Sequence, residues 1–150
     1  MHTSVADIPV VEPFPWRTLL EYFSHRLIPG VERVEGERFV RRVGKREITI
    51  GFDAPRARLL VTADGRVKTA QIAEHAARLF AVTHDASSLA KDLQHDPVLG
   101  TRLAAVPGMR PLGAWSPFEL CVRTIIGQQV TVAAAGTLMR RFVDRCGEVT

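Results

Sequence analysis

The sequence lacks the features of a membrane or secreted protein. It contains no run of about 18 apolar residues, so no membrane span is predicted. The first ten residues, MHTSVADIPV, lack the basic segment and apolar core of a signal peptide, which favours a cytoplasmic location. Its length of 150 residues and hydrophobic content of 46% are ordinary for a globular protein.

Cysteine is also scarce. Cys121 and Cys146 are the two present, and neither belongs to a CxxC motif or a Cys/His cluster. We therefore expect no zinc site, no iron–sulfur site and no other cofactor. Both cysteines fall in predicted helices, where we expect small buried thiols.

The basic charge is slight and spread along the chain. The net charge is +4, and residues 1–83 carry 13 basic against 10 acidic side chains. Such a charge fits a nucleic-acid partner without establishing one. One group of basic residues flanks a predicted hairpin turn at Gly44. The favoured interpretation is that these side chains are solvated on the hairpin, and the alternative is that they form an edge that contacts phosphates. Its members are Arg38, Arg41, Arg42, Lys45 and Arg46.

Hydrophobic periodicity predicts an α+β domain over residues 1–83. Apolar residues at helical spacing predict helices over 15–28 and 69–81. Strands are predicted over 7–12, 31–35, 38–43 and 58–62, and Ile48, Ile50 and Phe52 alternate with polar residues in a further strand. The order indicates an antiparallel sheet with its two helices packed on one face.

Residues 84–150 contain only helix signals, so we place a domain boundary near Thr83 and expect an incomplete helical domain after it. Asp85 and Asp96 are predicted N-caps, with Pro97 at a first helical position. Residues 107–111 form a loop.

Two helices are predicted to meet at a short loop within residues 115–142. Ser116 is a predicted N-cap, Pro117 suits the first helical position, and Glu119 would complete a capping box. Gly127 would end this helix in the left-handed conformation, and Thr131 would cap the next helix.

The intervening loop holds Gln128, Gln129 and Val130 between two anchored ends, where binding residues are often found. From the residues alone, the favoured interpretation is a polar loop whose amides cap nearby helix ends.

This region resembles the helix-hairpin-helix DNA glycosylases, in the form of the bacterial DNA-3-methyladenine glycosylase II family (AlkA type). The resemblance rests on residues 117–119 (PFE), 122–123 (VR) and 125–133 (IIGQQVTVA). It extends to residues 16–33 and 78–80, and is continuous from about residue 8 to residue 147. It implies an AlkA-type amino-terminal domain followed by the first helices of an all-α glycosylase domain.

The resemblance implies a base-flipping role for the loop. In this family the loop enters the minor groove of damaged DNA, and Gln129 matches the residue that fills the vacated stack. Gln128 would border the base pocket, and Val130 and Thr131 would contact DNA. The implied partner is double-stranded DNA with alkylated bases, and the full-length protein is expected to be a monomer without a metal.

Tyr22 and Arg26 lie one helical turn apart, off the predicted core stripe. From the residues alone, Tyr22 packing over Arg26 on an exposed flank is the favoured interpretation. The resemblance places both in the base pocket, where an aromatic face would attract a positively charged methylated purine.

The resemblance ends before the catalytic group. The family aspartate follows a Leu-Pro-Gly-Ile/Val-Gly hairpin, and neither is present. Residues 106–109 (VPGM) start similarly, but Arg110 replaces the second glycine and the segment precedes the loop. Asp144 is in the wrong place, so we assign no catalytic residue. We expect the amino-terminal part of a glycosylase that is inactive by itself, with Ile125, Leu138 and Phe142 incompletely buried.

Two functional classes therefore remain. One is a DNA base-excision enzyme, of which this chain is a truncated portion, and the other is a non-catalytic DNA-binding or partner-binding module. A helix-turn-helix transcription factor is disfavoured, because the second helix begins with residues 133–136 (AAAG), which cannot read base edges.

Overall fold

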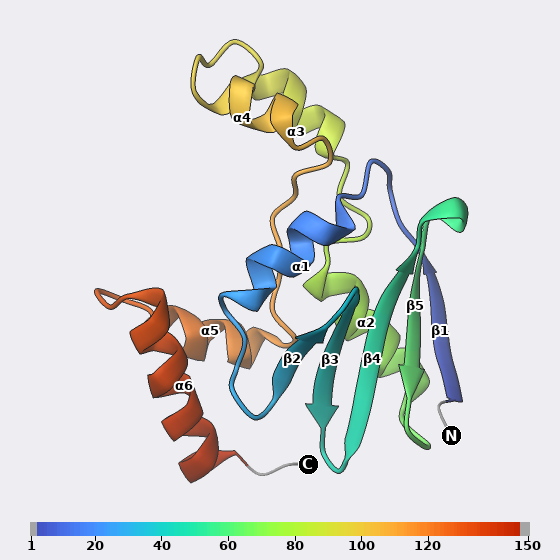
Figure 1. Ribbon diagram of the computed structural model, residues 1–150, viewed down its shortest axis with the longest axis vertical. Coiled ribbons are helices and arrows are strands. Elements are labelled where there is room, and N and C mark those ends of the chain that lie inside the picture. Colours follow the sequence, from blue (N-terminus) through green and yellow to red (C-terminus); the bar gives the residue numbers. More distant parts are fainter. Residues whose placement is uncertain (1–2, 148–150) are drawn as a thin grey trace.

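The computed structural model describes residues 3–147, within which five strands form one sheet (Figure 1). The strand order is β1-β5-β4-β3-β2, and every neighbouring pair is antiparallel. The strands are β1 (Thr3–Pro9), β2 (Glu32–Glu35), β3 (Arg38–Val43), β4 (Arg46–Asp53) and β5 (Arg58–Ala63), and a short 3-10 turn, η1 (Ala54–Arg56), joins the last two. The predicted α+β class is confirmed.

The period-two pattern of β4 determines which side faces the core. Ile48 and Ile50 are fully buried and lie opposite Ala63 and Val61 of β5. The predicted bounds of β3 are confirmed, whereas β1 begins and ends earlier than residues 7–12. The reason is its partner: β1 pairs along the whole length of β5, from Thr3 opposite Ala63 to Pro9 opposite Arg58.

Two helices, α1 (Trp16–Ser24) and α2 (Thr69–Leu79), bury their apolar stripes against this face of the sheet. Phe39 of β3 contacts both Phe23 of α1 and Phe80, which follows α2, with ring centroids 5.4 and 5.7 Å apart. The helices therefore share one core with the sheet, as predicted. In Figure 1, α2 passes behind the strands.

The first helix is shorter than the predicted 15–28. After Ser24 the chain turns, and the Ile28 amide donates to the Glu32 carboxylate at 2.9 Å. A side chain of β2 therefore binds the backbone that would have continued the helix.

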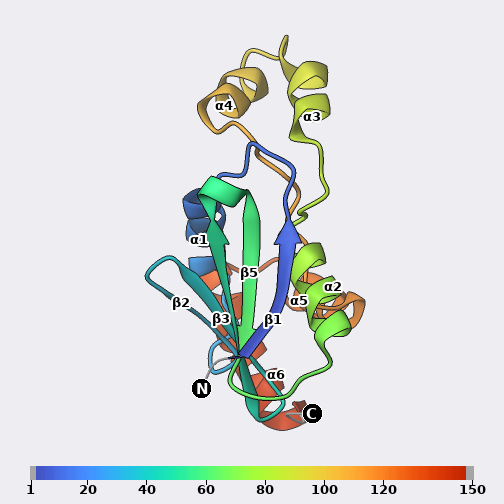
Figure 2. The same cartoon turned by 90° about the vertical axis from the view of Figure 1, so that its right-hand side faces the viewer.

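A helical arm, α3 (Ala86–Leu93) and α4 (Leu99–Ala105), projects beyond the sheet (Figures 1 and 2). Asp85 caps α3 as predicted, accepting from the Ser87 amide at 2.9 Å. Asp96 accepts from the Val98 and Leu99 amides, but α4 begins at Leu99 and its N-cap residue is Val98, so the prediction of Asp96 as the N-cap is wrong. The prediction of Pro97 as a first helical residue is wrong, because Pro97 lies in the preceding turn.

The loop after the arm is fastened to the core by Arg110, which is only 4% exposed. Its guanidinium donates to the carbonyls of Gly108, Ala81, Val11 and Pro13, at 2.7 to 3.1 Å. Arg110 therefore joins the segment after β1, the segment after α2 and the loop itself. Burial lowers the pKa of Arg110, and no carboxylate among the described residues pairs with it.

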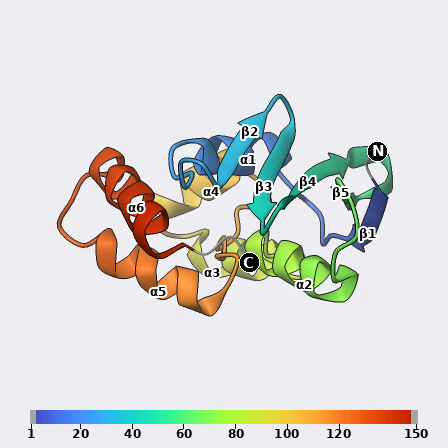
Figure 3. The ribbon, with the colours of Figure 1, turned by 90° about the horizontal axis from the view of Figure 1, so that it is seen from below.

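The last helices, α5 (Pro117–Ile126) and α6 (Val132–Cys146), lie beside the β2–β3 side of the sheet (Figures 1 and 3). Helix α5 exposes large apolar side chains: Phe118 and Ile125 are each 70% exposed. Leu138 is exposed and Phe142 half-buried, which confirms the expected incomplete burial. Across residues 3–147, no helix is both long enough and apolar enough to cross a membrane.

Candidate nucleic-acid interface and base pocket

The joint between α5 and α6 is capped at both helix starts as predicted. Ser116 Oγ accepts from the Glu119 amide at 3.2 Å, and Pro117 occupies the first helical position. Thr131 Oγ1 accepts from the Ala134 amide at 3.2 Å. The residues that join the two helices, 127–131, are called the Gln loop below. The start of α6 is capped by Thr131 of this loop, not by a glutamine side chain.

The prediction that Gly127 adopts the left-handed conformation is wrong. Gly127 has φ −77° and ψ −6°, because its amide continues the helical pattern by donating to the Arg123 carbonyl at 2.9 Å. The chain reverses two residues later, at Gln129, with φ 57°. For a residue with a Cβ this conformation costs roughly 1–2 kcal/mol. The strain therefore lies on the residue predicted to enter the DNA stack.

Gln128, Gln129 and Val130 are all exposed, as residues that contact a large partner would be. Val130 and Gly127 line a cleft of 320 Å³ between α1, α5 and α6, which we call the α1–α5 cleft. Gln128 and Gln129 are adjacent to these lining residues but do not line the cleft themselves.

Tyr22 and Arg26, which belong to or follow α1, also line the α1–α5 cleft. The Arg26 guanidinium lies 4.0 Å from the centroid of the Tyr22 ring, and its Nη1 donates to the Tyr22 carbonyl at 3.2 Å. Tyr22 is 45% exposed, so this is the half-exposed Tyr–Arg stack that the residues alone favoured. The fold thus places this stack and the Gln loop around one cavity.

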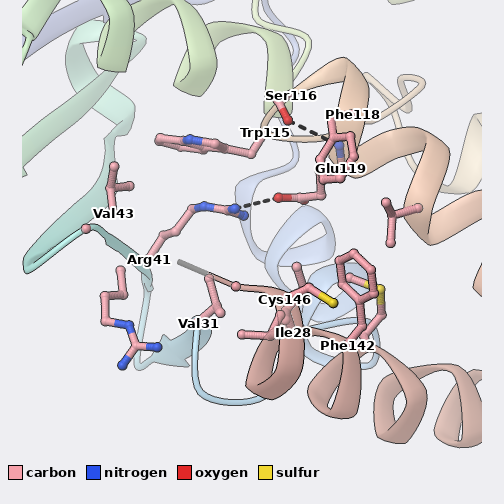
Figure 4. A pocket seen from close by; sticks show the side chains of 16 residues that line it. Ile28, Val31, Arg41, Val43, Trp115, Ser116, Phe118, Glu119, Phe142 and Cys146 are labelled. Atoms are coloured by element: carbon pink, nitrogen blue, oxygen red, sulfur yellow. Dashed lines mark hydrogen bonds and ion pairs between the residues drawn. The ribbon is translucent and has the colours of Figure 1, made fainter. Parts of the chain in front are cut away.

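Two glutamates and two arginines form a closed ring of ion pairs between the sheet and α5. We call Glu32, Arg41, Glu119 and Arg123 the ion-pair ring. Arg41 donates Nη1 to Glu32 Oε1. It also donates Nη2 to Glu119 Oε2, a bond drawn in Figure 4. Arg123 donates Nη2 to Glu32 Oε2 at 2.7 Å and Nε to Glu119 Oε1 at 2.9 Å. Each carboxylate oxygen of the ring therefore accepts from an arginine.

For two members of the ring, the neighbouring charges outweigh the effect of burial on the pKa. Burial alone would raise the pKa of Glu119, but Arg41 and Arg123 outweigh it and hold the pKa below the ordinary 4.5. Burial alone would lower the pKa of Arg123, but Glu32 and Glu119 raise it above its ordinary value. The two positive and two negative formal charges cancel.

The sequence predictions missed this ring. The Glu119 side chain was expected to close a capping box, but its two oxygens bind arginines instead. Arg41 was expected on a solvated hairpin or a phosphate-contacting edge, yet it is 7% exposed and stacks 4.8 Å from the centroid of a Trp115 ring. The rest of that basic group is exposed: Arg38, Arg42, Lys45 and Arg46.

A second pocket, of 520 Å³, lies on the other side of the ring, between the β3–β4 hairpin and helices α5 and α6 (Figure 4). Arg41, Trp115 and Glu119 contribute to its lining, together with apolar side chains such as Val43 and Phe142. Cys146 also lines it.

Both Cys121 and Cys146 are exposed, so the expectation of buried thiols is wrong: their helices pack on one face only.

The described residues offer no group of three or more His, Cys, Asp and Glu side chains that could hold a metal ion. Asp144 is 68% exposed on α6, 3.9 Å from Arg140. Its carboxylate is therefore part of a solvated helix pair.

Known proteins resemble this arrangement in sequence and in fold. The family model of the AlkA N-terminal domain matches residues 5–116. DNA-3-methyladenine glycosylase 2 of Escherichia coli K12 is 30% identical over 147 residues, which cover 91% of this chain and 48% of that protein. A 3-methyladenine DNA glycosylase structure from Archaeoglobus fulgidus has a TM-score of 0.74 at 16% identity, and the match covers 93% of this chain and 50% of that one.

The match to the family model runs across the predicted boundary near Thr83, and that boundary stays a prediction. The chain spans about half the length of the curated relative. Because the family model covers most of the chain, the protein belongs to the AlkA N-terminal domain family and is related to the DNA-3-methyladenine glycosylases.

Proposed function

We propose that this chain is the amino-terminal part of a monomeric, cytoplasmic base-excision glycosylase. Its substrate is double-stranded DNA that carries alkylated bases such as 3-methyladenine, and its reaction is hydrolysis of the bond between the base and the deoxyribose. The observation that supports the proposal is the α1–α5 cleft, whose lining includes the Tyr22–Arg26 stack and, from the Gln loop, Gly127 and Val130.

In this proposal the Gln loop opens the DNA. Gln129 enters the space left by the extruded nucleotide, and its amide hydrogen-bonds the unpaired opposite base. Its strained, exposed backbone supports this role, because strain that the surrounding fold maintains is often found at functional sites. Gln128 borders the base pocket, and Val130 and Thr131 contact the DNA.

Tyr22 and Arg26 form the wall that recognises the base. A methylated purine is a cation, and Arg26 already holds a cation over the Tyr22 ring in the free protein. The damaged base would take over this position when Arg26 moves aside. Recognition then depends on the positive charge of the base, and a neutral purine gains less from replacing the guanidinium.

Hydrolysis needs a carboxylate that the cleft does not supply. Glu119 lies close to the cleft, but both of its oxygens are bound by arginines. We therefore propose that residues 1–150 alone bind damaged DNA and release no base. Detection of free 3-methyladenine from alkylated DNA incubated with the purified chain would contradict this.

The loop assignment is tested with Gln129→Ala and two duplexes, one intact and one with a central tetrahydrofuran abasic analogue. Gln71→Ala is the matched control, because Gln71 is an exposed glutamine on α2. A role in filling the stack predicts that Gln129→Ala weakens abasic binding by roughly tenfold, about 1.4 kcal/mol, and leaves intact-duplex affinity unchanged. Equal loss on both duplexes would refute the role.

A non-catalytic binding module is the second candidate, because α5 presents exposed Phe118 and Ile125 to a partner. The same assay separates the two accounts. If the unmodified chain binds both duplexes equally, base flipping is rejected and a partner-binding role becomes the leading account.

A further inference from the structure

The ion-pair ring connects three elements of the fold, β2, β3 and α5. Glu32 begins β2, Arg41 belongs to β3, and Glu119 and Arg123 lie one turn apart on α5. In addition, Arg123 Nη1 donates to the Arg26 carbonyl, just beyond α1, at 2.8 Å. Arg123 therefore contacts β2, α5 and the end of α1 through three separate donors.

Arg123 also lines the α1–α5 cleft, together with Tyr22, Arg26 and Val130. One of its hydrogen bonds fixes the backbone of Arg26, which forms the recognition wall. The Gln loop starts four residues after Arg123, and the Gly127 amide donates to the Arg123 carbonyl at 2.9 Å. The same residue thus contacts both the wall and the start of the loop.

Apolar packing does little to fix α5, because the helix buries no large apolar side chain. Phe118, Leu120 and Ile125 are between 52% and 70% exposed, whereas Glu119 is 9% exposed. Apolar contacts are non-directional, but a planar guanidinium with three bound acceptors tolerates little rotation or sliding. A buried ion pair can therefore contribute geometry even where it contributes little net stability.

We propose that Arg123 is a positioning residue that sets the width of the α1–α5 cleft. By holding the end of α1 and the body of α5 at a fixed separation, it keeps the Gln loop at the distance from the Tyr22–Arg26 stack that a flipped base requires. This role in recognition rests on the proposed function, whereas its geometrical part does not.

The geometry is tested by the distance between nitroxide labels, measured by pulsed electron paramagnetic resonance. One label is placed on Cys121 of α5, which is exposed, and the other on α1 through Ser24→Cys, with Cys146→Ser removing the remaining thiol. Arg123→Met removes all three donors. Arg17→Met is the matched control, because it breaks an ion pair with Glu37 that is largely exposed.

Recognition is tested on the same variants without labels, with the intact and abasic duplexes. We expect Arg123→Met to broaden the distance distribution and to reduce the preference for abasic DNA by roughly two- to thirtyfold, the range for network residues that do not touch the ligand. Arg17→Met should leave both unchanged. Thermal unfolding of each variant verifies that it is folded.

Arg123→Lys retains the charge and replaces Arg123→Met in both measurements if Arg123→Met does not fold. A lysine ammonium cannot bind the three acceptors in the guanidinium geometry, so this variant should also broaden the distribution. Unchanged distributions in the folded variants would overturn the proposal. If distances change but the unmodified chain shows no abasic preference, the proposed function fails while the geometrical role stands. If the distances change and the abasic preference does not, the role in recognition is rejected.

Discussion

Glu119→Gln should be among the most destabilising conservative substitutions in this chain. The variant keeps the size of the side chain but leaves Arg41 and Arg123 facing one carboxylate instead of two. The Glu119 side chain is only 10% exposed, so water cannot replace the lost charge. Removing one partner of a buried pair costs roughly 3–5 kcal/mol, because the remaining charge is uncompensated.

This cost is large beside the total stability of about 5–15 kcal/mol that is usual for a protein. For a chain of this size it corresponds to a melting temperature lower by roughly 6–20 °C. Glu37→Gln is the matched control, because it breaks the solvated pair with Arg17 and should cost at most about 1 kcal/mol.

The difference between Glu119→Gln and the unmodified protein should depend on pH. The pKa of Glu119 is below 4.5 in the folded state, so its ionisation stabilises the fold above about pH 4.5. As the pH falls towards the folded pKa, the carboxyl becomes protonated and this stabilisation is lost. The gap between the two proteins should therefore narrow in acid and stay constant between pH 6 and 8.

Urea unfolding at a series of pH values measures this gap, provided that the slope with urea is the same for both proteins. A difference below about 1 kcal/mol at neutral pH, similar to that of Glu37→Gln, would refute the argument. It would mean that solvent reaches Arg41 and Arg123 and that the ring contributes no more than a surface pair.

Four other predictions concern the rest of the fold. Arg110→Met should destabilise the protein by about 3 kcal/mol or more in urea unfolding, because four carbonyls lose their donor; a change below 1 kcal/mol would show that water replaces the guanidinium. Gly108→Ala should be at least as damaging by melting temperature, because φ is 86° and the new Cβ would lie 2.0 Å from a backbone oxygen; unchanged melting would contradict this. Cys121 and Cys146 should both react with a thiol reagent in the native protein, and protected thiols would mean that α5 and α6 are covered. Phe118→Ser should reduce the binding of an apolar dye while changing the free energy of unfolding by less than about 0.5 kcal/mol. Unchanged dye binding would likewise mean that these helices are covered.

The sequence specified those parts of the fold that depend on neighbouring residues. The alternation of Ile48 and Ile50 with polar residues determined the buried side of β4, and Ser116 and Thr131 cap their helices through amides three residues away. In each case the interaction and the pattern that predicts it lie within a few positions.

The reversal after α5 could not be predicted by the same means. Propensity favours Gly127 for the left-handed conformation, but the structure uses Gln129. The choice depends on where α6 must begin in order to pack beside α5, and this is a property of the assembled helices. Local preference amounts to roughly 1–2 kcal/mol here, and helix packing overrides it.

The ion-pair ring exposes a limit of a different kind. The spacing of Glu119 and Arg123 by four positions was visible as a helix pair, and pairs of this kind are usually solvated. Arg41 is 78 positions from Glu119, so no local pattern indicates that one faces the other. Charged residues are expected at the surface unless each has a buried partner of opposite charge. For the ion-pair ring, this requirement is met only when all four side chains are buried together. Because burying any one member alone would be unfavourable, a ring of this kind becomes predictable only when all four residues are placed together.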